Sequence, residues 1–177
     1  ALLAVAMALE LRAPALPPVT EAPSGDAALL ARGADLARAG NCMACHTARG
    51  GAPYAGGRRI ATPFGDLYAG NLTPDPETGL GTWSLDAFRR ALHEGRSRDG
   101  HLLYPAFPYV HFTRLSDGDV TALWAHLRSL PPVRQPHTPH TLRFPYNTQV
   151  ALALWRVLFF APGPVSYTHL RAHETSL

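Results

Sequence analysis

The chain has 177 residues, 46% of them apolar, and a formal net charge of +3 at neutral pH. This length suits one domain with extensions, and the modest charge gives no reason to expect a nucleic-acid partner. Seventeen prolines and fifteen glycines indicate long irregular connections, which are typical of a small fold wrapped around a prosthetic group.

The first residues form an apolar run, ALLAVAMALELRA over 1–13, that is too short to span a bilayer. We interpret it as the end of a signal sequence or of a membrane anchor, with a helix packed on the domain as the alternative. Three prolines follow shortly and end any helix. Residues 1–25 are therefore predicted to be a remnant of such a signal or anchor, followed by a proline-rich linker.

The first helix of the domain is predicted between Asp26 and Ala39, where DAALLARGADLARA has apolar positions at helical spacing. Ser24 or Asp26 can cap its start, and Gly40 ends it. The helix therefore leads directly into the five residues CMACH, which contain both cysteines of the chain.

Cys42, Cys45 and His46 form a C-x-x-C-H pattern, which is typical of a c-type haem attachment site. Two thiols add to the haem vinyl groups to form thioethers, and the adjacent histidine supplies an axial nitrogen to iron. The two cysteines and the histidine need this spacing because one tight turn must present all three groups to the porphyrin. The favoured hypothesis is thus one covalently bound haem c.

Three other uses of a C-x-x-C pair compete with haem binding. A zinc site needs two further ligands, but no third cysteine exists, and His137 and His140 lie far downstream in a proline-rich segment. A thioredoxin-like dithiol requires a βαβ setting, and no strong strand precedes Cys42. A plain disulfide would be strained and would leave His46 unexplained.

Residues 48–82 are rich in proline and glycine and show little periodicity. Loops of this length in a compact domain are normally functional or disordered, and we expect this one to cover a haem edge. Ser84 can cap a second helix over Leu85–Glu94, which Gly95 ends.

Ser116 can open a third helix over 117–130, which two prolines end. A last apolar helix is expected over 149–160. It is too short to cross a membrane and should lie against the domain, a neighbouring domain or the lipid interface. No β alternation is visible, so the predicted fold class is all-α.

Several long motifs resemble one protein family. They are ARAGNCMACHTA, TPFGDLYAGNLTPDPETGLGTWS, EGRSRDGHLLYPAFPY, RLSDGDVTALWAHLRSLPPV, and LRFPYNTQ ahead of WRVLFF. From about Arg32 to Phe160 the chain is similar to the first haem domain of the multihaem cytochrome c subunits of bacterial membrane-associated dehydrogenases. These include the alcohol, gluconate and molybdenum-hydroxylase types. The resemblance implies a class I cytochrome c-like fold, with few helices and long loops wrapped around one covalent haem.

The resemblance also implies an organisation of the chain. Helices 26–39 and 117–130 should cross, with Gly33 permitting the close approach. The cytochrome c domain is expected over 26–145, and an apolar helix over 146–164 would lead to a further haem domain. Residues 165–177 show no helix or strand pattern and resemble a translated sequencing-library adapter, so we expect a non-native tail.

In many domains of this family, a methionine in the tyrosine- and proline-rich loop binds iron opposite the histidine. Phe107 occupies that position here and has no lone pair to offer. His111, four residues further on, is the best remaining candidate for the sixth ligand, and His101 is the second. Water or an open coordination site are the alternatives.

Aromatic and basic residues are expected around the haem. Trp83, Tyr104 and Tyr109 combine a flat apolar body with a hydrogen-bond donor, and Phe107 should contribute to the apolar wall. Arginine side chains could neutralise the haem propionates; the candidates are Arg58, Arg59, Arg96 and Arg98.

By the same resemblance, we expect an electron-transfer subunit rather than an enzyme. Its partner would be a dehydrogenase catalytic subunit, and its electron acceptor would be a quinone or a terminal oxidase. The expected location is periplasmic with membrane association. The missing methionine leaves a second hypothesis, a haem protein with an open distal iron that binds or senses small ligands.

Overall fold

A computed structural model describes residues 2–19 and 25–163 of the chain, so the predicted tail at 165–177 lies outside the described residues. In chain order the elements are α1 (Leu2–Glu10), α2 (Ala27–Ala39), α3 (Cys42–Cys45), β1 (Arg59–Thr62), β2 (Gly65–Tyr68), α4 (Leu85–Glu94), α5 (Tyr109–Phe112), α6 (Asp117–Arg128), β3 (Thr141–Leu142) and α7 (Gln149–Phe159). Seven helices with few strands fit the predicted class I cytochrome c-like fold.

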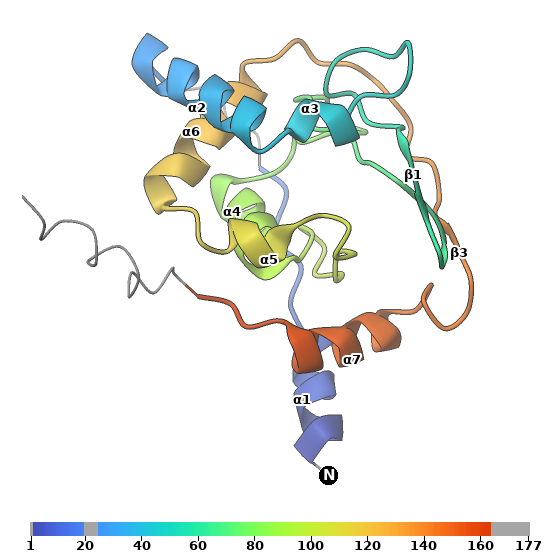
Figure 1. Ribbon diagram of the computed structural model, residues 1–177. Helices are drawn as coiled ribbons and strands as arrows, with labels where there is room; N and C mark the ends of the chain where they lie inside the picture. Colours follow the sequence, from blue (N-terminus) through green and yellow to red (C-terminus); the bar gives the residue numbers. More distant parts are fainter. Residues whose placement is uncertain (1, 20–24, 164–177) are drawn as a thin grey trace, which may run out of the picture.

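Helices α2 and α6 cross, as predicted (Figure 1). At the crossing, a Cβ placed on Gly33 would lie 2.0 Å from the carbonyl oxygen of Ala122 and 2.7 Å from the Cβ of His126. Only glycine therefore allows this approach. Beside it, Arg32 and Asp119 form an ion pair at 2.6 Å that ties the two helices together.

One hydrophobic core fills the space between α2, α4 and α6. Asp26, Ser84 and Ser116 each cap a helix by accepting a hydrogen bond from the backbone N–H three residues ahead. These caps start the helices so that their apolar faces meet. The buried members of the core are Ala37, Tyr54, Leu80, Phe88, Leu92, Val120, Leu123, Trp124 and Leu127.

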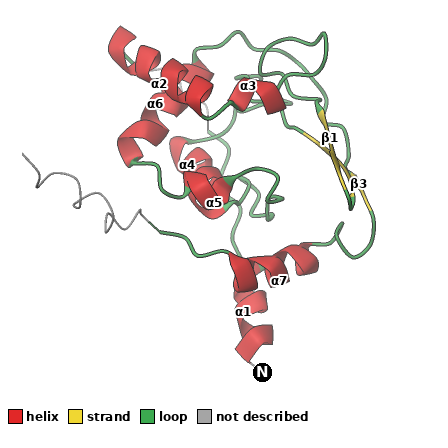
Figure 2. Ribbon diagram, in the orientation of Figure 1, coloured by secondary structure: helices red, strands yellow, loops and turns green. Residues whose placement is uncertain are grey.

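The prediction that residues 48–82 form only a loop is wrong, because two strands lie in this segment. The prediction of a purely helical fold is wrong for the same reason. Strands β1 and β2 form an antiparallel hairpin, and β3 pairs with β2 to give the order β1-β2-β3. The strands lie at one side of the molecule, away from α2 and α6 (Figure 2). Gly65 has φ +124 and packs against the backbone of Thr141, a close approach that suits glycine.

The two end helices pack on each other at the end of the molecule opposite α2 and α6 (Figure 1). Met7 of α1 packs against a small buried cluster of Leu102, Leu152 and Ala153. Gln149 at the start of α7 accepts a hydrogen bond from the Leu102 N–H at 2.7 Å and donates to its carbonyl at 3.2 Å. Within residues 2–19 and 25–163, no helix has the length and apolar character to cross a membrane.

The segment predicted to be a linker is attached to the domain where it is described. The Leu16 N–H donates to the Arg98 carbonyl at 2.8 Å, and the Val19 N–H donates to the Thr82 carbonyl at 3.1 Å. These contacts attach Leu16 to the loop that follows α4 and Val19 to the loop that precedes it.

Replacing Gly33 with alanine should destabilise the fold strongly. The new methyl group must displace the α6 backbone at Ala122, and overpacking of this kind costs about 3 kcal/mol. Chemical denaturation of the haem-loaded protein measures the free energy of unfolding. Gly118→Ala is the matched control, since this exposed α6 glycine has open space and should gain about 0.5–1 kcal/mol of helix stability. Equal stability of Gly33→Ala and wild type would contradict the crossing.

Candidate haem attachment site

The C-x-x-C-H motif forms a single helical turn, α3, directly after α2. Asn41 adopts the left-handed conformation with φ 53 and redirects the chain between the two helices. The His46 N–H donates to the Cys42 carbonyl at 3.0 Å and closes the turn. Cys42 is half-buried against the core, whereas Cys45 is exposed, and both are free thiols. The turn thus offers two reduced sulfurs three residues apart.

The imidazole of His46 is fixed by a backbone contact. Its Nδ1 lies 2.7 Å from the carbonyl oxygen of Gly70. A carbonyl only accepts, so Nδ1 carries the proton and Nε2 keeps its lone pair. Burial lowers the pKa of His46 below its ordinary value, and the hydrogen bond to Gly70 offsets part of this. The ring is therefore neutral at pH 7, as a metal ligand must be.

The Cys42 thiol does not have the character of a thiol in a redox dithiol. Burial raises the pKa of Cys42 above its ordinary value, whereas catalytic C-x-x-C pairs have lowered thiol pKa values. A zinc site is not supported either, because no group of three or more His, Cys, Asp or Glu side chains in the described parts of the chain could hold a metal ion. The donor set, two reduced thiols and one neutral imidazole on a single turn, fits covalent haem.

Two of the predicted haem contacts pack around the same core as the attachment turn. Trp83 and Phe107 are half-buried and lie on the core cluster that Cys42 also touches. Leu72 also packs on this cluster, and it lies two residues after Gly70, whose carbonyl oxygen contacts His46. Phe107 additionally packs on Phe112, with ring centroids 5.6 Å apart. These side chains could form an apolar haem wall.

Tyr104 and Tyr109 lie in other surroundings. Tyr104 packs on the small cluster around Leu102 and contacts the His140 ring edge-to-face at 5.3 Å. Tyr109 is fully buried, 5.0 Å from the Phe160 ring, and its hydroxyl has no hydrogen-bond partner among the described residues. Neither packs on the core cluster of Cys42, and their contact with haem stays a prediction.

The histidines proposed as distal ligands are at the surface. His111 is exposed on α5, and its imidazole has no hydrogen-bond partner in the part of the chain that the structure describes. The imidazole of His101 contacts the Asp99 carboxylate at 2.6 Å. The identity of the sixth ligand therefore also stays a prediction.

Most of the arginines considered for the propionates have other partners. Arg59 pairs with Asp66, Arg96 with Glu10, and Arg98 donates to Thr82. Arg58 is exposed at the start of the hairpin. Of the four, Arg58 alone makes no ion pair or hydrogen bond through its side chain within the described residues.

Sequence reasoning missed two residues that support the site. Gly70 contributes only its carbonyl group, which no sequence pattern marks. Asn71 organises the loop beside it: its amide donates to the Val133 carbonyl at 2.7 Å, and its side-chain oxygen accepts from the Thr73 N–H at 2.9 Å. The Asn-Leu-Thr-Pro run signalled a turn, since Asn side chains commonly bond nearby backbone.

Comparison with known proteins agrees with this geometry. Residues 30–131 match the family described as Cytochrome c. The chain belongs to the cytochrome c family. That family implies covalent haem c, and the thiols and imidazole of α3 are the groups that would hold it.

Three relatives extend the assignment. Over 151 residues the cytochrome is 50% identical to a nicotinate dehydrogenase subunit of Pseudomonas putida, a match that covers 85% of this chain and 13% of that protein. It is 40% identical to the cytochrome c subunit of alcohol dehydrogenase (quinone) of Gluconacetobacter polyoxogenes, with coverage of 85% and 32%. It is 44% identical to the gluconate 2-dehydrogenase cytochrome c subunit of Pantoea cypripedii, with coverage of 75% and 30%.

These relatives confirm the predicted family. Two of the three are named as cytochrome c subunits of dehydrogenases, so the prediction of an electron-transfer component rather than a catalytic subunit is also confirmed. The chain spans less than one third of the length of each of these curated relatives.

Removing the thiols one at a time should reveal two separate attachments. Cys42→Ser and Cys45→Ser should each leave haem bound through a single thioether, and the double variant should lose covalent haem altogether. Haem staining after denaturing electrophoresis and pyridine haemochrome spectra read the number of thioethers. Met43→Ser, on the same turn and half exposed, should keep both. Covalent haem in the double variant would exclude this site.

Proposed function

We propose that this cytochrome transfers single electrons through one covalently bound haem c, as part of a periplasmic dehydrogenase complex. The observation that carries the proposal is the α3 turn, where two free thiols precede an imidazole whose Nδ1 is fixed on the Gly70 carbonyl. When bound, haem supplies one-electron chemistry. The chain's own part is to orient the His46 imidazole through the Gly70 carbonyl, and Trp83 and Phe107 would supply an apolar wall beside the haem.

The partner is inferred from the relatives. Proteins named as subunits of nicotinate, alcohol and gluconate dehydrogenases match most of this chain. We therefore propose that a dehydrogenase catalytic subunit supplies the electrons, and that a quinone or a terminal oxidase receives them. Further haem domains in the full-length protein are consistent with the small share of each relative that the chain covers.

The ligand on the side of the iron opposite His46 strongly affects the reduction potential of the haem. Thioether ligation raises the potential relative to a second imidazole, but neither methionine of this chain is suited to the distal role. Met7 packs between α1 and α7, and Met43 is exposed on the attachment turn itself. We propose His111 as the sixth ligand, which gives a lower-potential relay. An open distal iron is the second candidate, because Phe107 stands where a methionine is expected.

Visible spectra of the matured protein should separate these candidates. If His111 binds iron, carbon monoxide leaves the reduced wild-type spectrum unchanged, and His111→Ala creates a carbon monoxide shift. His101→Ala is the control, since that exposed imidazole is held by Asp99 and should have no effect. A shift already present in the wild type supports the open iron. Protein without haem absorbance after maturation would overturn the electron-transfer proposal.

One end of the molecule is suited to a lipid surface. We define the apolar end by the exposed large apolar side chains of α1, of the residue that follows it and of α7, which packs on α1: Leu2, Leu3, Val5, Leu9, Leu11, Val150, Leu154, Leu158 and Phe159. The other exposed large apolar side chains of the described residues are Met43 on α3, and Phe64, Phe144 and Tyr146 in the hairpin turn and ahead of α7. Apolar patches of this extent mark interaction sites, and we propose that this end contacts the membrane interface.

Membrane contact should depend on the outer face of α7. Leu154 and Leu158 lie one turn apart and are both exposed, and burying each apolar side chain is worth about 1.5–3 kcal/mol. The double variant Leu154→Asp with Leu158→Asp should therefore bind vesicles of phosphatidylethanolamine and phosphatidylglycerol at least tenfold less in co-sedimentation. Met43→Asp, on α3, should bind like the wild type. Equal loss in both variants would contradict the proposal.

A further inference from the structure

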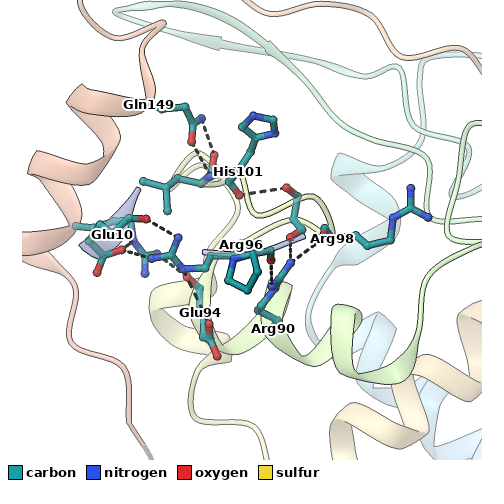
Figure 3. Close-up of polar contacts among 11 residues, drawn as sticks. Glu10, Arg90, Glu94, Arg96, Arg98, His101 and Gln149 are labelled. Atoms are coloured by element: carbon teal, nitrogen blue, oxygen red, sulfur yellow. Dashed lines mark hydrogen bonds and ion pairs between the residues drawn. The ribbon is translucent and has the colours of Figure 1, made fainter. Parts of the chain in front are cut away.

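A carboxylate in α1 pairs with two arginines buried in the domain (Figure 3). Glu10 Oε2 accepts hydrogen bonds from Arg96 at 2.5 Å and from Arg156 at 2.7 Å. The backbone carbonyl of Glu10 accepts a further bond from Arg96 at 2.6 Å. The two arginine side chains are only 9% and 4% exposed. Glu10 therefore acts as a shared counter-ion at the junction of α1, α7 and the loop after α4.

No other carboxylate takes this place among the described residues. Glu94 reaches Arg96 only at 4.0 Å, with a side chain that is half exposed, and it offers Arg156 its backbone carbonyl rather than its carboxylate. Arg156 also lies over the faces of the Phe160 and Tyr109 rings, at 4.6 and 5.6 Å from their centroids. Without Glu10, two buried guanidinium groups would face each other with little compensation, which is strongly destabilising.

The chain after Glu10 continues to follow the domain. Arg90 donates to the Pro14 carbonyl at 2.7 Å and also to the carbonyls of Ser97 and Arg98. Gly100, with φ +92, lies so close to the Ala13 backbone that a Cβ there would be 2.4 Å from its oxygen. This loop is therefore shaped to receive the segment that leads out of α1.

These contacts would be lost if the N-terminal segment were cleaved off as a secretory signal. An apolar stretch followed by a small-residue pattern such as Ala13-Pro14-Ala15 resembles the end of a cleaved secretory signal. Cleavage after Ala15 would remove Glu10 and the carbonyl that Arg90 binds. It would also uncover the cluster that Met7 covers.

We propose that α1 is retained in the mature, haem-loaded cytochrome as a structural part of its domain, with Glu10 as the counter-ion that holds it. The inference goes beyond the electron-transfer proposal and does not depend on it. As a consequence, the apolar helix that points away from the domain (Figure 1) stays part of the haem protein. The surface proposed to contact the membrane is then a permanent part of the fold.

N-terminal sequencing gives the direct test. The chain is expressed behind a cleavable export leader in a host that matures c-type cytochromes, and the purified holoprotein is sequenced. Retention predicts a start at or before Leu2. A start at Leu16, or anywhere after Glu10, overturns the proposal. The haem spectrum of the same sample shows separately whether the electron-transfer proposal fails.

Paired variants test the role of Glu10 itself. Glu10→Gln keeps the shape but removes the counter-charge that both arginines share, and it should lower the Tm of the holoprotein by about 5–10 °C. Adding Arg96→Met removes one of the unpaired charges and should recover part of that loss. Glu77→Gln, which breaks an exposed pair with Arg134, should leave the Tm unchanged. Equal Tm values for wild type and Glu10→Gln would contradict the counter-ion role, as would a further loss in the double variant.

Discussion

The approach of α2 and α6 at Gly33 controls where the haem attachment turn begins. The helix backbones are close enough that a Cβ at this position would overlap the Ala122 carbonyl, so the end of α2 has one place to lie. Gly40 and Asn41 then turn the chain into α3 within two residues. Because Cys42 packs on the same core as the crossing helices, the thiol positions depend on that single contact between two backbones.

The imidazole depends on a different part of the fold. His46 is oriented by the Gly70 carbonyl, and the residue before that glycine, Ala69, is joined to the hairpin by its N–H bond to the Arg58 carbonyl at 3.0 Å. The helices therefore position the sulfurs, and the small sheet positions the proximal nitrogen. Covalent haem held by the two thiols and the imidazole would connect these two parts.

The sequence predicted the helices well because their signals are local. Asp26, Ser84 and Ser116 are polar caps followed by apolar residues at helical spacing, and the observed helices start where these caps predict. The hairpin was missed for the opposite reason. Its strands have four residues each, too few for alternation to be visible, and β2 completes its pairing with β3 more than seventy residues further along the chain. No window of sequence contains that partner.

In the candidate site too, residues with a local sequence pattern could be predicted and contacts between distant residues could not. Cys42, Cys45 and His46 are contiguous, so their pattern alone identified the chemistry. The surroundings of Tyr109 could not be predicted, since its ring packs against Phe160, which lies about fifty residues later, directly after α7. Arg96 was interpreted as a propionate partner, but its guanidinium binds Glu10 of a segment interpreted as a leader or anchor. Glu10 lies 86 residues before Arg96 in the chain, so no local sequence pattern could predict the partner of this buried charge.

The composition of α1 links the buried charge to the apolar end. Met7 and Glu10 lie one turn apart and face the domain, where Glu10 meets its arginines and Met7 meets an apolar cluster. Leu2, Val5 and Leu9 are exposed on the remaining surface of the helix. A helix that is apolar on nearly every side is normally buried, and the domain covers only one of these sides. The ion pairs therefore hold in place a helix whose other face is still suited to burial, and a lipid interface would complete it.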